Sequence, residues 1–234
     1  MKLPKLVTFL FFLGLNSCIQ DDIIADFVPE EVRIISNVNT LTVGDVLKLE
    51  ASYFNKVGQK ENKTIVWESS NLKVLSIDEA NTISAESEGD ATISAKTTGD
   101  SGELTDSKFI MVVKKGDVVM PSESIKKGTF TPTSSYESAG DFEIKKNSTG
   151  IQIELSSNYI GDDSLPGFAL FLTNNPNSLV NALQIDAYDD SDGVHYKGAF
   201  IYNIEGVGLN DYKYLVQWCR PFSILVGQAL IMDK

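Results

Sequence analysis

Apolar and polar residues alternate in short runs along most of this chain, which is the pattern of half-buried β-strands. Clear examples are residues 64–67, 91–95 and 151–155, where every second side chain would point to the same face of a sheet. Turn-forming residues separate such runs, as at 88–90 and 148–150. No window after the first seventeen residues carries a capped helical stripe. The pattern therefore predicts an all-β fold.

A polar stretch divides this pattern in two. Residues 114–128 are rich in lysine and glycine and contain Pro121, between two regions of alternating apolar residues. We therefore predict a first domain over residues 28–115, a linker over 116–123 and a second domain over 124–232.

The chain begins with a short basic and apolar segment. Lys2 and Lys5 precede an apolar run over residues 6–15, which is too short to span a membrane as a mature helix. Cys18 follows a small residue directly. Residues 1–17 resemble a bacterial lipoprotein signal peptide, which implies that Cys18 is lipidated, for example with palmitate, and becomes the new N-terminus. The alternative is an ordinary secretory signal with an incidental cysteine.

Residues 18–27 form an acidic tether, with Asp21 and Asp22 close to the cysteine. This resembles the export signal of Bacteroidota-type lipoproteins and implies a protein anchored by lipid in the outer membrane and facing the cell surface. A solvated acidic linker is the alternative.

Net charge limits the possible partners. The chain has 20 basic and 32 acidic side chains, and loss of Lys2 and Lys5 with the signal would leave 18 basic ones and a net charge of −14. Such a chain is repelled by nucleic acid and by anionic lipid headgroups, so we predict no nucleic-acid partner and membrane contact through the lipid alone. Only Cys219 remains besides Cys18, so the domains must be held by hydrophobic burial without an intrachain disulfide.

The first domain resembles a bacterial immunoglobulin-like domain of the second group. The matching stretches are 41–44, 51–58, 67–71, 74–78, 82–85 and 89–95. Trp67 lies on an alternating strand and suits the space between two sheets, and Asn81 replaces a usual glycine at a turn that asparagine tolerates. The resemblance implies a Greek-key β-sandwich without catalysis, of the kind used in adhesins and as spacers.

The second domain resembles the DM-thirteen family, which is described as an electron-transfer module. The matching residues are Gly128 and Phe130, the strand 166–173, the Trp218, Cys219 and Phe222 signature, and the closing stretch 227–230. Two departures are the Pro166-Gly167 order and residues 198–202, where the family has an ordinary Tyr-x-x-Pro. The resemblance implies a second β-sandwich and an electron-transfer or thiol redox role for Cys219.

Cys219 is therefore the candidate catalytic residue. A reactive thiol needs a nearby cation and solvent access, but Arg220 would point to the opposite face of the strand. The alternative is a buried structural cysteine. Haem held by Cys219 with His195 or a tyrosine opposite remains an option, although the chain lacks a Cys-x-x-Cys-His motif. We otherwise predict no cofactor.

His195 follows an acidic segment over residues 189–192. The acidic spacing does not fit a calcium-binding loop, so we favour a hairpin tip and predict no metal site. A weak surface calcium site remains an option, with the carboxylates of Asp186, Asp189, Asp190 and Asp192.

Aromatic residues near the C-terminus admit two explanations. Tyr196, Tyr202, Tyr212, Tyr214 and Trp218 could stack on sugar rings or could belong to the core, which is commoner for a strand of a sandwich.

Two functions follow from these features. The first is a thiol redox module centred on Cys219 and carried on an immunoglobulin-like spacer. The second is a non-enzymatic adhesion or ligand-binding protein with a protein or glycan partner at the cell surface. A hydrolase is the weakest option, because the chain has a single histidine and no aligned nucleophile. We expect no enzyme beyond a redox accessory, and the exposure of Cys219 separates the two functions.

Overall fold

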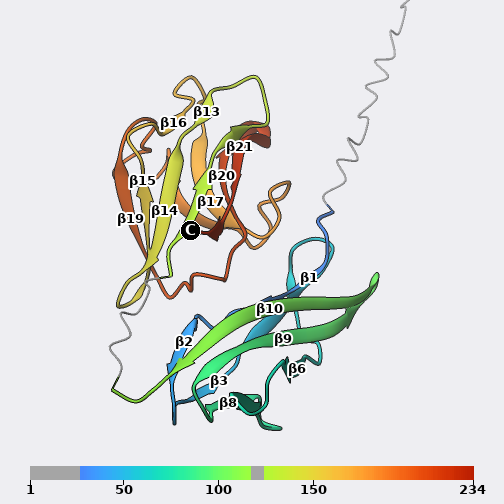
Figure 1. The fold of residues 1–234 in the computed structure, drawn as a ribbon. Helices are drawn as coiled ribbons and strands as arrows, with labels where there is room; N and C mark the ends of the chain where they lie inside the picture. The colour runs from blue at the N-terminus through green and yellow to red at the C-terminus, as the bar shows by residue number, and fades with distance from the viewer. Residues whose placement is uncertain (1–26, 117–123) are drawn as a thin grey trace, which may run out of the picture.

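The computed structural model describes residues 27–116 and 124–234. These residues form two all-β bodies (Figure 1), which confirms the predicted fold class. The signal over residues 1–17, Cys18, nearly all of the tether and all of the linker except Gly116 lie outside the described residues. Among the described residues, no helix is long and apolar enough to cross a membrane.

The N-terminal body is a β-sandwich of three sheets, ordered β2-β10-β9-β6, β1-β4-β5 and β3-β8-β7. Its strands are β1 (Glu31–Ile34), β2 (Thr40–Thr42), β3 (Val46–Lys48), β4 (Ala51–Phe54), β5 (Lys60–Glu61), β6 (Val66–Ser69), β7 (Leu75–Ile77), β8 (Thr82–Ala85), β9 (Gly89–Gly99) and β10 (Gly102–Val113). The long β9–β10 hairpin runs through the body, with Phe109 opposite Thr92. Alternation buries one face of each strand, as along β9, where Ala91, Ile93 and Ala95 point inward.

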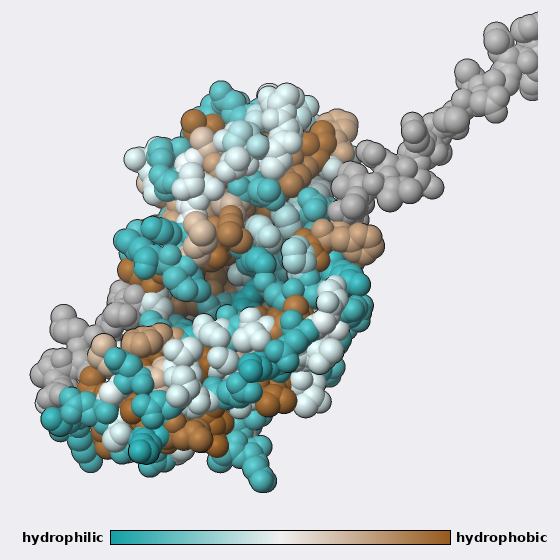
Figure 2. Space-filling model, turned by 45° about the vertical axis from the view of Figure 1, so that its right-hand side comes forward, coloured by the Kyte–Doolittle hydropathy of each residue, from teal (hydrophilic) through white to brown (hydrophobic). Residues whose placement is uncertain are grey.

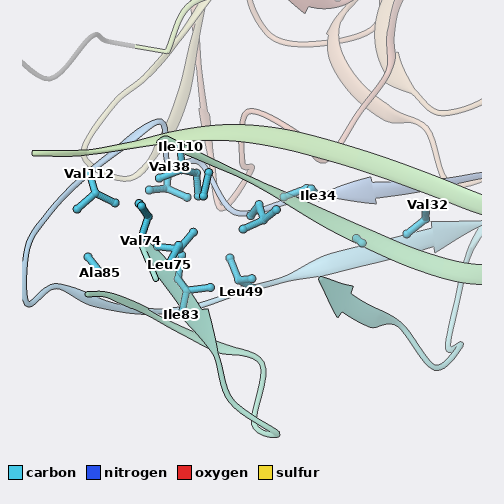
Figure 3. Packing of buried hydrophobic residues seen from close by; sticks show 13 residues of the cluster. Val32, Ile34, Val38, Leu49, Val74, Leu75, Ile83, Ala85, Ile110 and Val112 are labelled. Carbon is cyan, nitrogen blue, oxygen red and sulfur yellow. The ribbon is translucent and has the colours of Figure 1, made fainter. Parts of the chain in front are cut away.

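Most of the buried apolar side chains of this body form one cluster (Figure 3). Leu75, Ile83 and Ile110 are fully enclosed in it. Trp67 packs against the cluster but stays partly exposed, because β6 is an edge strand. Asn81 adopts the predicted left-handed conformation, with φ of 62°.

The C-terminal body is a second β-sandwich, with five-stranded sheets ordered β19-β15-β14-β11-β22 and β12-β21-β20-β17-β18 and a short β13-β16 pair. Its strands are β11 (Lys126–Thr129), β12 (Thr131–Pro132), β13 (Ser138–Ala139), β14 (Asp141–Lys146), β15 (Gly150–Leu155), β16 (Ile160–Gly161), β17 (Phe168–Thr173), β18 (Leu183–Ala187), β19 (Phe200–Glu205), β20 (Tyr214–Cys219), β21 (Ile224–Leu230) and β22 (Met232–Asp233). The main core lies between the two larger sheets and includes Phe142, Ile153 and Leu170.

The central strands β17 and β20 are buried on both faces. Leu170 and Leu172 of β17 point to the main core, whereas Ala169 and Phe171 point to a second apolar cluster on the other side. Residues Leu179 and Ala182, from the connection between β17 and β18, pack against that second cluster. An unbroken apolar run such as 168–173 is what such a strand requires.

Candidate functional site

Cys219 ends strand β20 and points into the sandwich. It pairs with Phe168 of β17 and has no exposed surface. Leu165, Phe168 and Val226 form an apolar cluster with it. Reactive thiols are accessible to solvent, and the fold does not give Cys219 that access.

Arg220 turns away from the sulfur, as the alternation predicts. It begins the 3₁₀ turn Arg220–Phe222, is exposed, and places its guanidinium Nη1 3.3 Å from a carboxylate oxygen of Asp189. The Arg220 charge is therefore paired with Asp189 at the surface. Cys219 lies in apolar surroundings that are typical of a structural cysteine.

His195 belongs to a buried network around Asp186. The Asp186 side chain is 4% exposed and accepts hydrogen bonds from the Tyr202 hydroxyl and, at 2.9 Å, from the His195 backbone amide. The His195 ring stacks on Phe200 with centroids 3.4 Å apart. Burial raises the pKa of Tyr202, and the hydrogen bond to Asp186 raises it further. The network links β18 with β19, which are edge strands of the two opposing sheets, so it closes one side of the sandwich.

The acidic segment after β18 is a turn, but not the tip of a hairpin. The hairpin prediction is wrong because β18 and β19 belong to different sheets. Asp190 accepts a hydrogen bond from the Ala187 amide at 2.8 Å, while Asp186 and Asp189 face the separate partners described above. Within residues 27–116 and 124–234, no group of three or more acidic, histidine or cysteine side chains is placed to hold a metal ion. The structure therefore offers no support for the calcium option.

The aromatic residues near the C-terminus belong mostly to the apolar clusters. Tyr214 and Trp218 pack in the second cluster on the outer side of β20, and Tyr202 is part of the main core. Tyr196 lies against Phe168, with ring centroids 5.4 Å apart. Tyr212 precedes β20 and packs against the main core, on the other side of the sheet from Trp218.

The two bodies meet through Arg33 on β1. Its Nη1 donates hydrogen bonds of 3.1 Å to Oδ1 of Asn174 and to the backbone oxygen of Asn210. Its guanidinium also lies 4.3 Å from the centroid of the Phe54 ring, a cation–π arrangement. Glu31 forms ion pairs with both Arg33 and Lys213. Strand β1 of the N-terminal body thus contacts two loops of the C-terminal body, the loop after β17 and the loop between β19 and β20.

Further contacts hold this joint. Asn210 Nδ2 donates to the backbone oxygen of Ile35 at 3.1 Å, and Asn175 Nδ2 donates to that of Val57 at 3.2 Å. A Cβ added to Gly58 would lie 2.6 Å from the backbone oxygen of Asn174, so the two backbones approach as closely as glycine allows. Phe54 is only 5% exposed, although it belongs to neither apolar core. The Arg33 guanidinium covers its ring, and Phe54 lines the space between the bodies together with residues of the C-terminal body.

A groove of about 410 Å³ lies beside this joint. We call it the interdomain groove and define it by Ser52, Gln59 and Lys60 of the N-terminal body and Asn181, Asp211 and Tyr212 of the C-terminal body. Its volume is in the range of small-molecule sites, which often lie between domains. Figure 2 shows polar and apolar side chains interspersed on one face, with a hollow between the two bodies.

Nothing in the sequence pattern pointed to this groove. Arg33 is a polar residue on an alternating strand, and Gln59 lies in the connection between β4 and β5. Polar residues at such positions normally face solvent. Only the contact between two distant parts of the chain makes them neighbours. Of the predicted site residues, Cys219 is buried away from the groove, and Cys18 lies outside the described residues.

Comparison with known proteins adds no assignment. No family model matches the chain, and no curated protein is significantly similar to it.

Proposed function

We propose that this protein is a non-enzymatic binding protein of the cell exterior, anchored by lipid on Cys18 in the outer membrane. The observation that carries this proposal is the interdomain groove, a concave site whose two walls are held in place by Arg33 and its partners. Rigid walls favour binding because little freedom is lost when a ligand is ordered between them.

The N-terminal body has a larger role in this proposal than that of a spacer. Ser52, Gln59 and Lys60 form one wall of the groove, so neither body presents the site alone. The proposed site therefore lies at the contact between the two bodies, and not within the immunoglobulin-like body or the body that resembles an electron-transfer module.

The complete burial of Cys219 favours binding over thiol redox chemistry. The test is maleimide labelling of the protein in detergent micelles, with the labelled peptide located by mass spectrometry and an absorption spectrum of the same sample. We expect Cys219 to label only after denaturation and no haem band. The variant Ser107→Cys, at an exposed position, is the positive control for labelling.

The opposite outcome supports the electron-transfer hypothesis. Rapid labelling of native Cys219, or a Soret band that disappears in Cys219→Ser, would replace the binding proposal with a redox module.

The membrane anchor has its own test. In cells fed a palmitate analogue, the Cys18→Ala variant should lose the acyl label and leave the outer-membrane fraction. External protease should cleave the anchored wild-type protein in intact cells. An unchanged acyl label in the variant would contradict lipidation at Cys18, and protection from protease would contradict the outward-facing orientation.

A further inference from the structure

We propose that the interdomain groove binds a neutral, polyhydroxylated ligand, a short saccharide segment. This inference rests on the proposed binding function and adds the chemical class of the ligand. Three features of the groove carry it: unused hydrogen-bonding groups, apolar surface and charge.

The groove holds several polar groups without a protein partner. Ser52 is 4% exposed, and its hydroxyl makes no hydrogen bond within the described part of the chain. The side-chain amides of Gln59 and Asn181 and the Tyr212 hydroxyl are likewise unpartnered among residues 27–116 and 124–234. Amides and hydroxyls both donate and accept hydrogen bonds, which matches the dual character of sugar hydroxyls.

The groove also has an apolar component. Val180, which is 60% exposed, and Val207 line it together with Tyr212. Ring faces and small aliphatic groups pack against the C–H faces of a pyranose, while the polar edge of an aromatic such as tyrosine stays available for hydrogen bonds. A groove for an amphipathic peptide helix would instead offer a continuous apolar surface, whereas this lining mixes polar with apolar residues.

Charge disfavours an acidic ligand. Lys60 and Asp211 contribute opposite charges to the lining, and the chain as a whole has a net charge of −12. Its field repels phosphate, sulfate and uronate groups at long range. A neutral saccharide meets no such repulsion and uses the unpartnered amides and hydroxyls directly.

Binding to an immobilised panel tests this inference. The panel carries neutral oligosaccharides, sulfated or uronate-containing oligosaccharides, and gelatin as a coat of unfolded protein. The labelled protein is applied in detergent micelles, and the strongest neutral ligand is then titrated by calorimetry. We expect neutral oligosaccharides to bind.

The variant Gln59→Ala combined with Asn181→Gly should weaken binding about tenfold or more, because two hydrogen-bonding amides are lost. Glycine suits position 181, where φ is +60°. The matched control is Asn37→Ala combined with Asn62→Ala, which removes two exposed side-chain amides that do not line the groove and have no partner within the described ranges. This control should bind as the wild type does, and all variants should show a wild-type melting transition.

Three results would overturn the inference: preference for acidic oligosaccharides, no binding to any neutral one, or neutral binding that the groove variant leaves unchanged. Capture on gelatin that is lost in the groove variant would exclude a saccharide and keep the proposed function. Rapid labelling of native Cys219 would instead overturn the proposed function, so the two failures are distinguishable.

Discussion

Arg33 donates a hydrogen bond of 3.1 Å to Oδ1 of Asn174 across the contact between the two bodies. The two residues are 141 positions apart in the chain. Because the same guanidinium covers Phe54 and bonds to Asn210, we expect this one side chain to couple the stability of both bodies. We therefore expect the joint and the groove beside it to form and unfold together.

Replacing Arg33 with methionine should uncouple the bodies. Arg33→Met keeps an apolar stem over Phe54 but removes two hydrogen bonds and the ion pair with Glu31, which should cost about 2–4 kcal/mol. The two tryptophans, Trp67 and Trp218, report on separate bodies. In single-tryptophan variants, urea transitions that coincide in the wild type should separate in Arg33→Met.

The control for this prediction is Arg220→Met. Arg220 is exposed and, among the described residues, its side chain pairs only with groups of its own body, so its loss should cost less than about 1 kcal/mol and leave the transitions coincident. Coincident transitions in Arg33→Met as well would contradict the coupling.

A pair of glycine variants measures the close approach of the two backbones. Gly58 and Gly44 both have positive φ, 74° and 94°, but only Gly58 has a neighbour that a Cβ would strike. Both Gly→Ala changes carry the cost of a left-handed backbone. Gly58→Ala should also push Asn174 away, so we expect its melting temperature to lie at least about 3 °C below that of Gly44→Ala. Equal melting temperatures would show that the joint tolerates the added methyl group.

Glu30 should make the N-terminal body sensitive to acid. The hydrogen bond from the Tyr53 hydroxyl, with others from the Asp100 and Ser101 amides, lowers the pKa of Glu30 from 4.5 to about 2. Since the folded pKa lies below the unfolded one, the stabilisation is fully present above pH 4.5 and is lost as the pH falls toward 2. The urea midpoint followed by Trp67 should fall across this window.

The variant Glu30→Gln isolates this contribution. Other carboxylates titrate in the same range, so the informative quantity is the difference between wild type and variant at each pH. That difference should shrink as the pH falls from 4.5 to about 2. A difference independent of pH would contradict the assignment.

Two substitutions of Cys219 should separate a structural from a chemical role. Cys219→Ala removes a buried sulfur and should cost about 1 kcal/mol. Cys219→Ser places a hydroxyl in an apolar cluster and should cost about 1–3 kcal/mol. Urea unfolding followed by Trp218 measures both. If Cys219→Ser is more stable than Cys219→Ala, the surroundings of Cys219 would be polar. That result would contradict the apolar cluster around Phe168.

Removing Asp186 should open one side of the C-terminal sandwich. Asp186→Ala leaves the Tyr202 hydroxyl and the His195 amide without their acceptor, which should cost about 2–4 kcal/mol. Hydrogen exchange should rise at the edge strands β18 and β19 before it rises in β17 and β20. Uniform exchange over all four strands would show that the network does not stabilise this side locally.

Much of the local structure followed from the sequence. Alternation at 91–95 and 151–155 predicted strands that the structure has, because a strand places successive side chains on opposite faces. The same rule separated Cys219 from the charge of Arg220. It did not reveal whether the cysteine face was open, since burial depends on which sheet covers that face.

The all-β class was readable from the sequence alone, because it depends on the local pattern of apolar and polar residues. The tertiary structure decided three further points: that Cys219 is sealed against Phe168, that β18 and β19 lie in different sheets, and that Arg33 joins two bodies. Each of these depends on contacts between distant segments. Polar residues on an outer strand face look the same in sequence whether they meet water or another domain, so only the packing of the two bodies could define the groove.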